Sequence, residues 1–544
     1  MKTLLPIVAL ALSCSSAAWS AEERPNIVVI LVDDMGFSDI GCYGGEIPTP
    51  NLDQLAENGI RLTQFYNTGR CCPTRATLLT GLYSHQAGVG HMTGDYGVSG
   101  YQGHLNDRCV TIGDVARSAG YLTMLAGKWH VGSKDRRMWP RARGFDRFYG
   151  IPEGGGFYFQ VKKGRSIVLN DEVVASVDNP LPEGWYSTDA WTEYGLRFID
   201  EAKQMNKPFL LYLAHNAPHF PLQANAEDIA RFRGKYLDGW DKLSDQRLER
   251  QISMGLIDAK WAKADRPNRV SAWNTLDDED RDRFDHLMAA YAACVYRMDR
   301  AIGELVDGLK DRNQFENTLI LFMSDNGGCA ESGPSGKSVG NPTVANSNWF
   351  CGESWAWMQD TPFRKYKHYN HEGGIATPLI AHWPEGIADK GAWRHQPAHM
   401  IDIMATVTDL TEAEYPKKHK GHDIQGMEGV SLKPLFGDDK LVRKDSLYWE
   451  HEGNAAVRMD DWKLVRLGGK GTWELYNLKN DRTEHHDLAT QYPDRVAELS
   501  GRWSAWAQRC NVAPNGLPNR SAGNKAKARK KANKKKKQKA ATIR

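Results

Sequence analysis

The sequence predicts an α/β protein with a large mixed, mostly parallel sheet sandwiched by helices, plus a smaller C-terminal α+β domain with an antiparallel sheet. Three continuous apolar and β-branched runs, at 26–32, 208–214 and 318–324, predict strands buried on both faces. Helical patterns alternate with these runs, as in parallel sheets that helices cover on both faces. From about residue 446, short strands between turns replace this alternation and predict a separate antiparallel meander.

The individual elements follow from local signals along the chain. The helix predicted at 51–59 ends at a glycine, and the helix predicted at 71–81 has Pro73 in its first turn, where proline is tolerated. Further helices are predicted at 111–119, 188–204, 280–310 and 400–410, and further strands at 61–66, 121–125 and 378–382. The C-terminal meander has predicted strands at 447–450, 455–459, 462–467 and 473–477, followed by an amphipathic helix at 492–510.

The N-terminal residues 1–20 have the features of a secretory signal peptide. Lys2 precedes an apolar run at 4–12, and small residues follow, with cleavage expected after Ser20. The apolar run is too short to span a bilayer comfortably, which disfavours an uncleaved anchor. We therefore expect an exported protein, periplasmic or secreted, with a main α/β domain at 24–440 and a C-terminal α+β subdomain at 441–512.

The C-terminal residues 513–544 form a basic tail. The segment 520–544 contains twelve Lys or Arg and no Asp or Glu, so the formal net charge of +3 conceals a net negative remainder. Its low hydrophobic content predicts disorder. The simplest interpretation is a solvated extension, and the alternative, which we favour, is contact with an anionic polymer or the cell envelope. An exported protein is not expected to bind nucleic acid.

One short segment combines a reactive side chain with groups that bind anions. It reads Cys71-Cys72-Pro73-Thr74-Arg75-Ala76-Thr77-Leu78-Leu79-Thr80-Gly81. Cys71 falls at the predicted helix N-terminus, where backbone N–H groups and the helix dipole favour a bound anion. Arg75 follows one turn later and adds a fixed cation. A lone cysteine before a helix would more often be a buried structural residue, so the interpretation depends on the whole string.

Oxygen-bearing side chains follow two of the predicted buried strands. Asp33 and Asp34 come after the first run, and Asp325 and Asn326 come after the run at 318–324. Each pair alone would suit a turn or a helix cap. Because ligands of such sheets bind beyond the carboxyl ends of the strands, the two pairs are expected to meet there. Four hard oxygen ligands suit Ca²⁺ or Mg²⁺.

Basic side chains follow the other strands. Lys128 and His130 lie two residues apart after the strand at 121–125, so in an extended backbone they point to the same side. His219 follows the strand at 208–214. His215 lies nearer to the end of that strand and is expected to be a structural residue. Lys367 precedes Glu372 by five residues, and Lys365 is the alternative candidate for the basic residue of this segment.

The segment from Cys71 resembles the signature of the sulfatase family, in the alkaline phosphatase superfamily, which reads Cys-x-Pro-Ser/Thr-Arg-x-x-x-Leu-Thr-Gly. Every defined position matches, and the other segments follow in family order from about residue 24 to 510. The resemblance implies that a formylglycine-generating enzyme oxidises Cys71 to the catalytic aldehyde formylglycine. Cys72 is not the equivalent residue, because only Cys71 has proline two positions on and arginine four positions on.

The resemblance also implies roles for the remaining candidates. The metal ligands are expected to be Asp33, Asp34, Asp325, Asn326 and the modified Cys71, which hold one divalent cation, usually Ca²⁺, with Mg²⁺ as the alternative. The catalytic side chains are expected to be Cys71, Arg75, Lys128, His130, His219 and Lys367. In the family, His130 takes a proton from the second hydroxyl of the aldehyde hydrate, and His219 faces the leaving oxygen.

The implied activity is hydrolysis of sulfate monoesters of carbohydrates or aryl alcohols to the alcohol and inorganic sulfate. A formylglycine-dependent phosphonate or phosphodiester hydrolase would share most of the site. A non-catalytic protein that binds sulfated glycans would need an unconverted Cys71. The segment at 327–360, rich in Gly, Ser, Asn and Trp, is expected to overhang the pocket.

Overall fold

The computed structural model describes residues 24–437, 440–443, 445–513 and 517. The predicted signal peptide at 1–20 and the basic segment at 520–544 lie outside these residues. Across the described part of the chain, no helix combines the length and the apolar character needed to cross a membrane.

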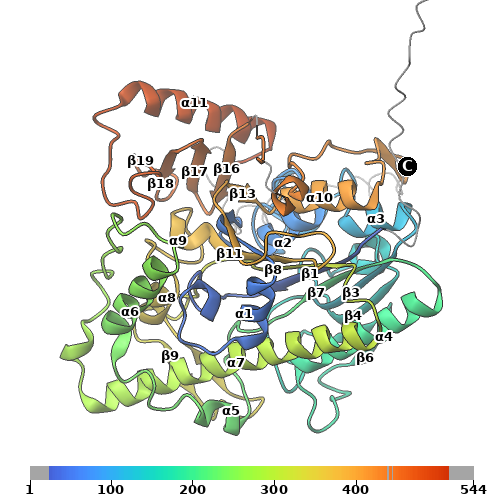
Figure 1. Ribbon diagram of the computed structural model, residues 1–544, viewed down its shortest axis with the longest axis horizontal. Helices are drawn as coiled ribbons and strands as arrows, with labels where there is room; N and C mark the ends of the chain where they lie inside the picture. Colours follow the sequence, from blue (N-terminus) through green and yellow to red (C-terminus); the bar gives the residue numbers. More distant parts are fainter. Residues whose placement is uncertain (1–23, 438–439, 444, 514–516, 518–544) are drawn as a thin grey trace, which may run out of the picture.

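An eleven-stranded sheet forms the centre of the molecule (Figure 1). Its order is β12-β2-β11-β8-β1-β7-β3-β4-β5-β6, with β13 also paired to β2. The middle strands β8, β1, β7, β3 and β4 are parallel, and β11 runs antiparallel between β2 and β8. The strands are β1 (Asn26–Val32), β2 (Ile60–Tyr66), β3 (Leu122–Lys128), β4 (Arg147–Ile151), β5 (Ile167–Leu169), β6 (Glu172–Ala175), β7 (Phe209–Ala214), β8 (Thr318–Ser324), β11 (Ala376–His382), β12 (Ala392–Arg394) and β13 (Ala398–His399).

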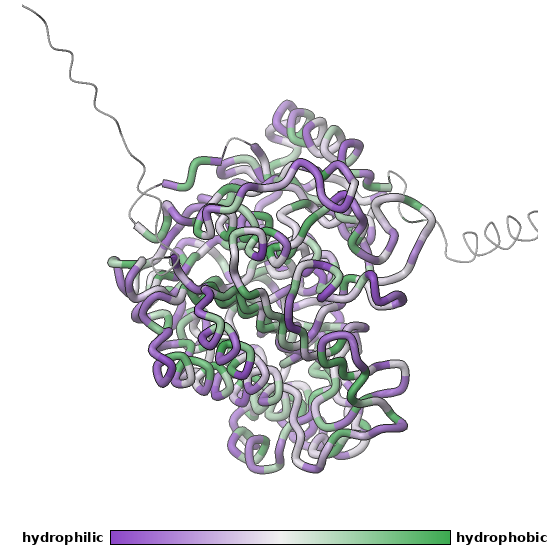
Figure 2. The backbone as a smooth tube through the Cα atoms, turned by 90° about the vertical axis from the view of Figure 1, so that its right-hand side faces the viewer, coloured by the Kyte–Doolittle hydropathy of each residue, from purple (hydrophilic) through white to green (hydrophobic). Residues whose placement is uncertain are grey.

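Helices cover both faces of this sheet, as the apolar runs predict. Alternate residues of β1 belong to two separate cores, with Val28 and Ile30 on one face and Ile27 and Val29 on the other. One face carries α1 (Pro50–Glu57), α4 (Ser187–Gln204) and α7 (Asp278–Asp311), which lie on the same side in Figure 1. The other carries α2 (Cys71–Thr80), α3 (Ile112–Ser118) and α10 (Asp402–Thr411). Figure 2 shows hydrophobic segments through the middle and hydrophilic ones outside.

The C-terminal unit has its own four-stranded antiparallel sheet, in the order β16-β17-β18-β19. Its elements are β16 (Leu447–His451), β17 (Asn454–Met459), β18 (Trp462–Arg466), β19 (Trp473–Asn477) and α11 (Pro493–Arg509). Leu499, Trp503 and Trp506 on α11 are buried, so the amphipathic face packs on this sheet. The predicted fold class is confirmed in both parts.

Several helices and strands of the structure were not predicted, because their sequences show no clear apolar pattern. The helix α6 (Gly239–Ser253) buries Arg247, which pairs with Asp39 and Glu46, and Gln251 beside Trp240 and Leu243, so its inner face is only partly apolar. The remaining short elements are α5 (Ala226–Ala230), α8 (Glu353–Gln359), α9 (Glu372–Ile375), β9 (Lys337–Val339), β10 (Asn348–Phe350), β14 (Lys418–His419) and β15 (His422–Asp423). Apolar periodicity cannot find elements that are held by ion pairs or are only a few residues long.

Candidate active site

The predicted site residues converge at the carboxyl edge of the sheet. Asp33 and Asp34 follow β1, Lys128 ends β3, and Asp325 follows β8. The N-terminus of α2 lies over the same edge. Parallel strands place their ends together, so residues far apart in the sequence share one pocket at this edge.

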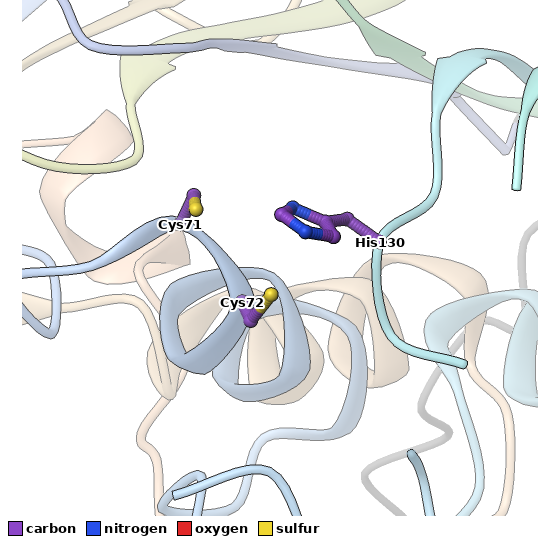
Figure 3. Close-up of side chains that lie close together, drawn as sticks. All are labelled: Cys71, Cys72 and His130. Carbon is purple, nitrogen blue, oxygen red and sulfur yellow. The ribbon is translucent and has the colours of Figure 1, made fainter. Parts of the chain in front are cut away.

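Cys71 is the first residue of α2, and its side chain is buried. Figure 3 shows the imidazole of His130, from the loop after β3, facing the thiols of Cys71 and Cys72. The ligand atoms of the three residues all lie within 4.8 Å of one another. A hydrogen bond with Cys72, the charge of Lys128 and a hydrogen bond with His130 lower the pKa of Cys71 well below its usual value despite burial. Residue 71 therefore sits where an anionic group is stabilised.

Two fully buried ion pairs form the base of the pocket. The guanidinium of Arg75 donates from Nε and Nη2 to Oδ2 of Asp325, at 3.1 and 2.8 Å. The ammonium of Lys128 donates to Oδ2 of Asp33. Burial alone would raise the pKa of Asp33, but the charges of Lys128, His219 and Arg75 lower it to about 2. Asp33 is therefore ionised at neutral pH.

Asp34 contacts three further side chains of the site, those of Lys367, Asn326 and His219. The ammonium of Lys367 lies 2.7 Å from Oδ1 of Asp34, and Nδ2 of Asn326 donates to the same oxygen at 2.9 Å. Nε2 of His219 lies 3.6 Å from Oδ2 of Asp34. The structure thus brings the basic side chains of two further segments to the carboxylates that follow β1.

The oxygen-bearing residues fit a hard cation. Oδ1 of Asp33 and Oδ1 of Asn326 are buried without a hydrogen-bond partner, although such atoms are normally paired. Burial and the adjacent Asp33 carboxylate also raise the pKa of Asp325 well above its usual value. A divalent cation among Asp33, Asp34, Asp325 and Asn326 would satisfy the partnerless oxygens and offset this repulsion.

The structure distinguishes Lys367 from its alternative Lys365, and His219 from its alternative His215. Lys367 is buried against Asp34, whereas Nζ of Lys365 lies over the ring of Tyr369, 5.1 Å from its centroid. His215 is fully buried, and burial lowers its pKa to about 3. Neither of its ring nitrogens has a hydrogen-bond partner. Lys365 and His215 therefore lie apart from the charged groups of the pocket.

Two residues beside the site, Glu331 and Gly154, were not predicted from the sequence. Glu331 lies 3.2 Å from the ammonium of Lys367 and 3.1 Å from the guanidinium of Arg70, yet its segment follows no recognisable pattern. Gly154 has φ +82°, and a Cβ at this position would lie 2.0 Å from Cδ2 of His130. The run of three glycines at 154–156 is the signal that could have indicated a close approach.

Clustered cations, buried carboxylates and an activated residue at a helix N-terminus define a hydrolase of anionic esters. The sulfatase family model matches residues 25–413. A second model, N-sulphoglucosamine sulphohydrolase, C-terminal, matches residues 363–502. The chain belongs to the sulfatase family and is a sulfuric ester hydrolase, which confirms the resemblance and the enzyme class.

Curated relatives and solved structures agree with this assignment. An uncharacterized sulfatase of Schizosaccharomyces pombe is 33% identical over 528 residues, covering 90% of this chain and 94% of the relative. An arylsulfatase of Klebsiella aerogenes is 33% identical over 436 residues, covering 76% and 92%. The crystal structure of Ps i-CgsB in complex with k-i-k-neocarrahexaose matches with a TM-score of 0.68 at 26% identity, covering 92% and 96%.

Proposed function

We propose that the protein hydrolyses sulfate monoesters of carbohydrates or aryl alcohols with formylglycine made from Cys71 and one Ca²⁺, with Mg²⁺ as the alternative ion. The observation that carries this proposal is the position of Cys71. It lies at the N-terminus of α2, opposite His130, in the pocket that contains the partnerless oxygens of Asp33 and Asn326. Oxygen donors of this kind suit Ca²⁺ better than a soft metal.

The hydrated aldehyde would supply one hydroxyl to attack sulfur and a second whose deprotonation releases sulfate. Charge on the sulfate oxygens would be neutralised by Arg75, Lys128 and Lys367, each of which is held by a buried carboxylate of the site. Burial lowers the pKa of His130 to about 4, with Lys128 contributing, so its imidazole is neutral and can accept a proton from residue 71.

Proton transfers at the two ends of the ester need separate groups. Asp325 is the proposed acceptor for the attacking hydroxyl, because Arg75 holds its carboxylate at the same edge of the sheet as the N-terminus of α2. His219 and Lys367 are proposed to assist the leaving oxygen from the other side of Asp34. Neither Ser nor an unconverted Cys at position 71 offers a second hydroxyl, so either would remain sulfated after one reaction.

The substrate is proposed to bind with its alcohol portion beside an aromatic wall. The rings of His219 and Phe220 stack with centroids 4.1 Å apart, and Phe220 stacks on Phe350 at 4.1 Å. Phe350 belongs to the segment at 327–360 that the sequence places over the pocket. Such rings accept either a sugar face or an aryl group. The arylsulfatase relative and the carbohydrate complex of Ps i-CgsB support both classes.

The proposed location is outside the cytoplasm, periplasmic or secreted, because residues 1–20 have a signal-peptide pattern. An exported sulfatase would meet sulfated polysaccharide fragments. The basic segment at 520–544 is proposed to hold the enzyme near an anionic polymer or envelope surface. Maturation would require a formylglycine-generating enzyme as a transient partner.

Mass spectrometry of the tryptic peptide 71–75, from protein made in the native host, tests the modification. We expect the aldehyde at position 71 and steady-state turnover of an aryl sulfate. Cys71→Ser is expected to stop after one sulfation, and normal turnover by that variant would refute the mechanism. Protein with only thiol at position 71 that binds sulfated glycans without releasing sulfate would identify a binding protein instead.

Two further comparisons distinguish Ca²⁺ from Mg²⁺ as the bound ion, and sulfate esters from phosphate esters as the substrate. Dialysis against a chelator is expected to abolish turnover, and re-addition of Ca²⁺ and Mg²⁺ separately identifies the ion. Rates with matched aryl sulfate, phosphate monoester and phosphodiester substrates are expected to be highest for the sulfate. A higher kcat/KM for the phosphodiester would assign the enzyme to the alternative class.

A further inference from the structure

A second cluster of metal-ligating side chains lies outside the catalytic pocket, where the C-terminal unit meets the main domain. It comprises His91, from the loop after α2, His368, from the loop before α9, His451, at the end of β16, and Glu452, from the turn that follows. We call these four residues the histidine cluster. They come from three segments far apart in the sequence, so the fold alone brings them together.

The imidazoles converge on one carboxylate. Nε2 of His91 lies 3.5 Å and Nε2 of His451 lies 3.8 Å from Oε1 of Glu452. Nδ1 of His368 lies 2.9 Å from Oε2 of the same residue. Ligand atoms of His91, His451 and Glu452 all lie within 4.8 Å of one another. Tetrahedral Zn²⁺ with bonds of about 2.0–2.1 Å separates its ligand atoms by about 3.3 Å, close to these distances.

His451 supplies an independent indication of a ligand. Its side chain is 0% exposed, and neither Nδ1 nor Nε2 has a hydrogen-bond partner. A fully buried imidazole is normally paired, because leaving its nitrogens without partners costs free energy. Its Nε2 faces Glu452, and its ring is nearly perpendicular to that of His91, at 87°. A metal ion between them would satisfy this nitrogen.

We propose that the histidine cluster is a transition-metal site, most suited to Zn²⁺, that fastens the C-terminal unit to the rim of the catalytic pocket. The ligands are the imidazoles of His91 and His451 and the carboxylate of Glu452, a nitrogen-rich set that suits Zn²⁺ and not the hard cation of the catalytic site. Because His91 belongs to the main domain and the other two ligands to the C-terminal unit, the ion would tie the two together, which is a structural role.

The charges around the cluster are compatible with a cation. Nη1 of Arg70 contacts both ring nitrogens of His368, so His368 borders the site and is not one of its ligands. The charge of Arg70 is offset by Glu331, 3.1 Å away, and Glu452 carries the remaining negative charge. His368 also lies 3.1 Å from Glu331, which pairs with Lys367. Metal binding would therefore fix the rim residues that lie behind the catalytic lysine.

Cobalt binding to the full-length, formylglycine-converted protein tests the proposal. The protein is stripped with a chelator, saturated with Ca²⁺ to fill the catalytic pocket, and titrated with Co²⁺. We expect one equivalent to bind with the visible absorption of tetrahedral Co²⁺ and without a thiolate charge-transfer band, which excludes Cys71 and Cys72 as ligands. Zn²⁺ is expected to displace the Co²⁺ and remove the absorption.

Variants assign the signal to the cluster. His91→Ala and Glu452→Gln are expected to lose the cobalt spectrum, whereas His486→Ala, at a histidine whose side chain is 80% exposed, is expected to keep it. Circular dichroism checks that each variant is folded. An unchanged spectrum in both cluster variants, or no Co²⁺ bound by the wild type, would overturn the proposal. A rise only in KM for a sulfated oligosaccharide, without metal binding, would identify a substrate contact instead.

Discussion

Lys367 and Lys365 are two residues apart, yet only Lys367 lies beside Asp34. The ammonium of Lys367 is buried beside Asp34, and the charges of Asp34, Cys329 and Glu331 outweigh burial and raise its pKa well above the usual value. It therefore remains a cation throughout the working pH range. Lys365 lies over Tyr369, and burial lowers its pKa.

Replacing each lysine by alanine separates the two candidates. Lys367→Ala is expected to lower kcat by about 100- to 1,000-fold, the usual cost of removing one preorganised group that stabilises charge in the transition state. Lys365→Ala is the matched control and is expected to change kcat less than about threefold. Steady-state kinetics with an aryl sulfate measures both, and equal losses in the two variants would contradict the assignment.

Gly154 places a constraint on His130 that is purely steric. Because a Cβ at residue 154 would overlap the imidazole, Gly154→Ala is expected to displace His130 and to lower kcat by about 100-fold or more. Gly164→Ala is the control, because Gly164 has a similar φ of +76° and nothing within 4 Å of the added Cβ. Both variants pay a similar backbone cost of about 1–2 kcal/mol.

Thermal unfolding and kcat are measured on both glycine variants. Similar losses of stability with a loss of activity only at residue 154 would fit the steric argument. Full activity of Gly154→Ala would show that His130 tolerates the methyl group or is not needed.

The residues that the sequence could reveal are those with a fixed spacing to a motif. Cys71 and Arg75 stand out because Pro73 and the following helix surround them, and the Asp-Asp and Asp-Asn pairs stand out because they end apolar strands. Glu331 could not be predicted, since its role depends on contacts across the fold, and the three glycines at 154–156 indicate a close approach without revealing that His130 is the partner. The choice between Lys365 and Lys367 also depends on contacts across the fold, with Asp34 for Lys367 and with Tyr369 for Lys365.

At the scale of elements, α9 joins the pocket to the C-terminal sheet. Glu372, its first residue, is fully buried and accepts from Lys463 of β18 at 2.9 Å and from Arg482 at 2.9 Å. Burial would raise the pKa of Glu372, but the charges of Lys463 and Arg482 lower it to about 2. This glutamate, which marks the motif after Lys367, therefore serves the contact between the two units.

Glu372→Gln is expected to destabilise the protein by up to about 3–5 kcal/mol at neutral pH, because it leaves the buried Arg482 without its carboxylate and Lys463 with Glu484 alone. Since the folded-state pKa is depressed, the contribution of Glu372 is complete above its ordinary pKa of 4.5 and is lost as pH falls towards about 2. The difference in urea midpoint between wild type and variant should therefore narrow over this window. Glu498→Gln, on the surface of α11, is the control, and a constant difference across pH would contradict the linkage.

The elements also show where sequence patterns succeed. Buried strands such as β1 and β8 were predicted with their bounds because nearly every residue is apolar or β-branched, and α7 because its apolar stripe is long. The helix α6 escaped prediction because Arg247 and Gln251 occupy its buried face. Short strands such as β5 and β9 depend on pairing with neighbours and have no pattern of their own.

At the scale of the whole molecule, charge is divided between a net negative body and the basic segment at 520–544. This division predicts that the segment changes where the enzyme binds without changing its chemistry. The described residues of the pocket lie between 33 and 372, so hydrolysis of a small aryl sulfate depends on groups far from the segment in the sequence. Binding to an anionic polymer should instead depend on its twelve cations and weaken with salt.

Replacing the Lys and Arg residues of 520–544 by Gln keeps the length and removes the charge. The variant is expected to keep kcat/KM for a small aryl sulfate within about twofold, while its retention on a sulfated polysaccharide column falls to lower salt. Deletion of 520–544 should behave like the Gln variant, because charge and not length is responsible. Unchanged retention in both variants would show that the body of the enzyme binds the polymer, and a loss of kcat would show that the segment acts on the catalytic domain.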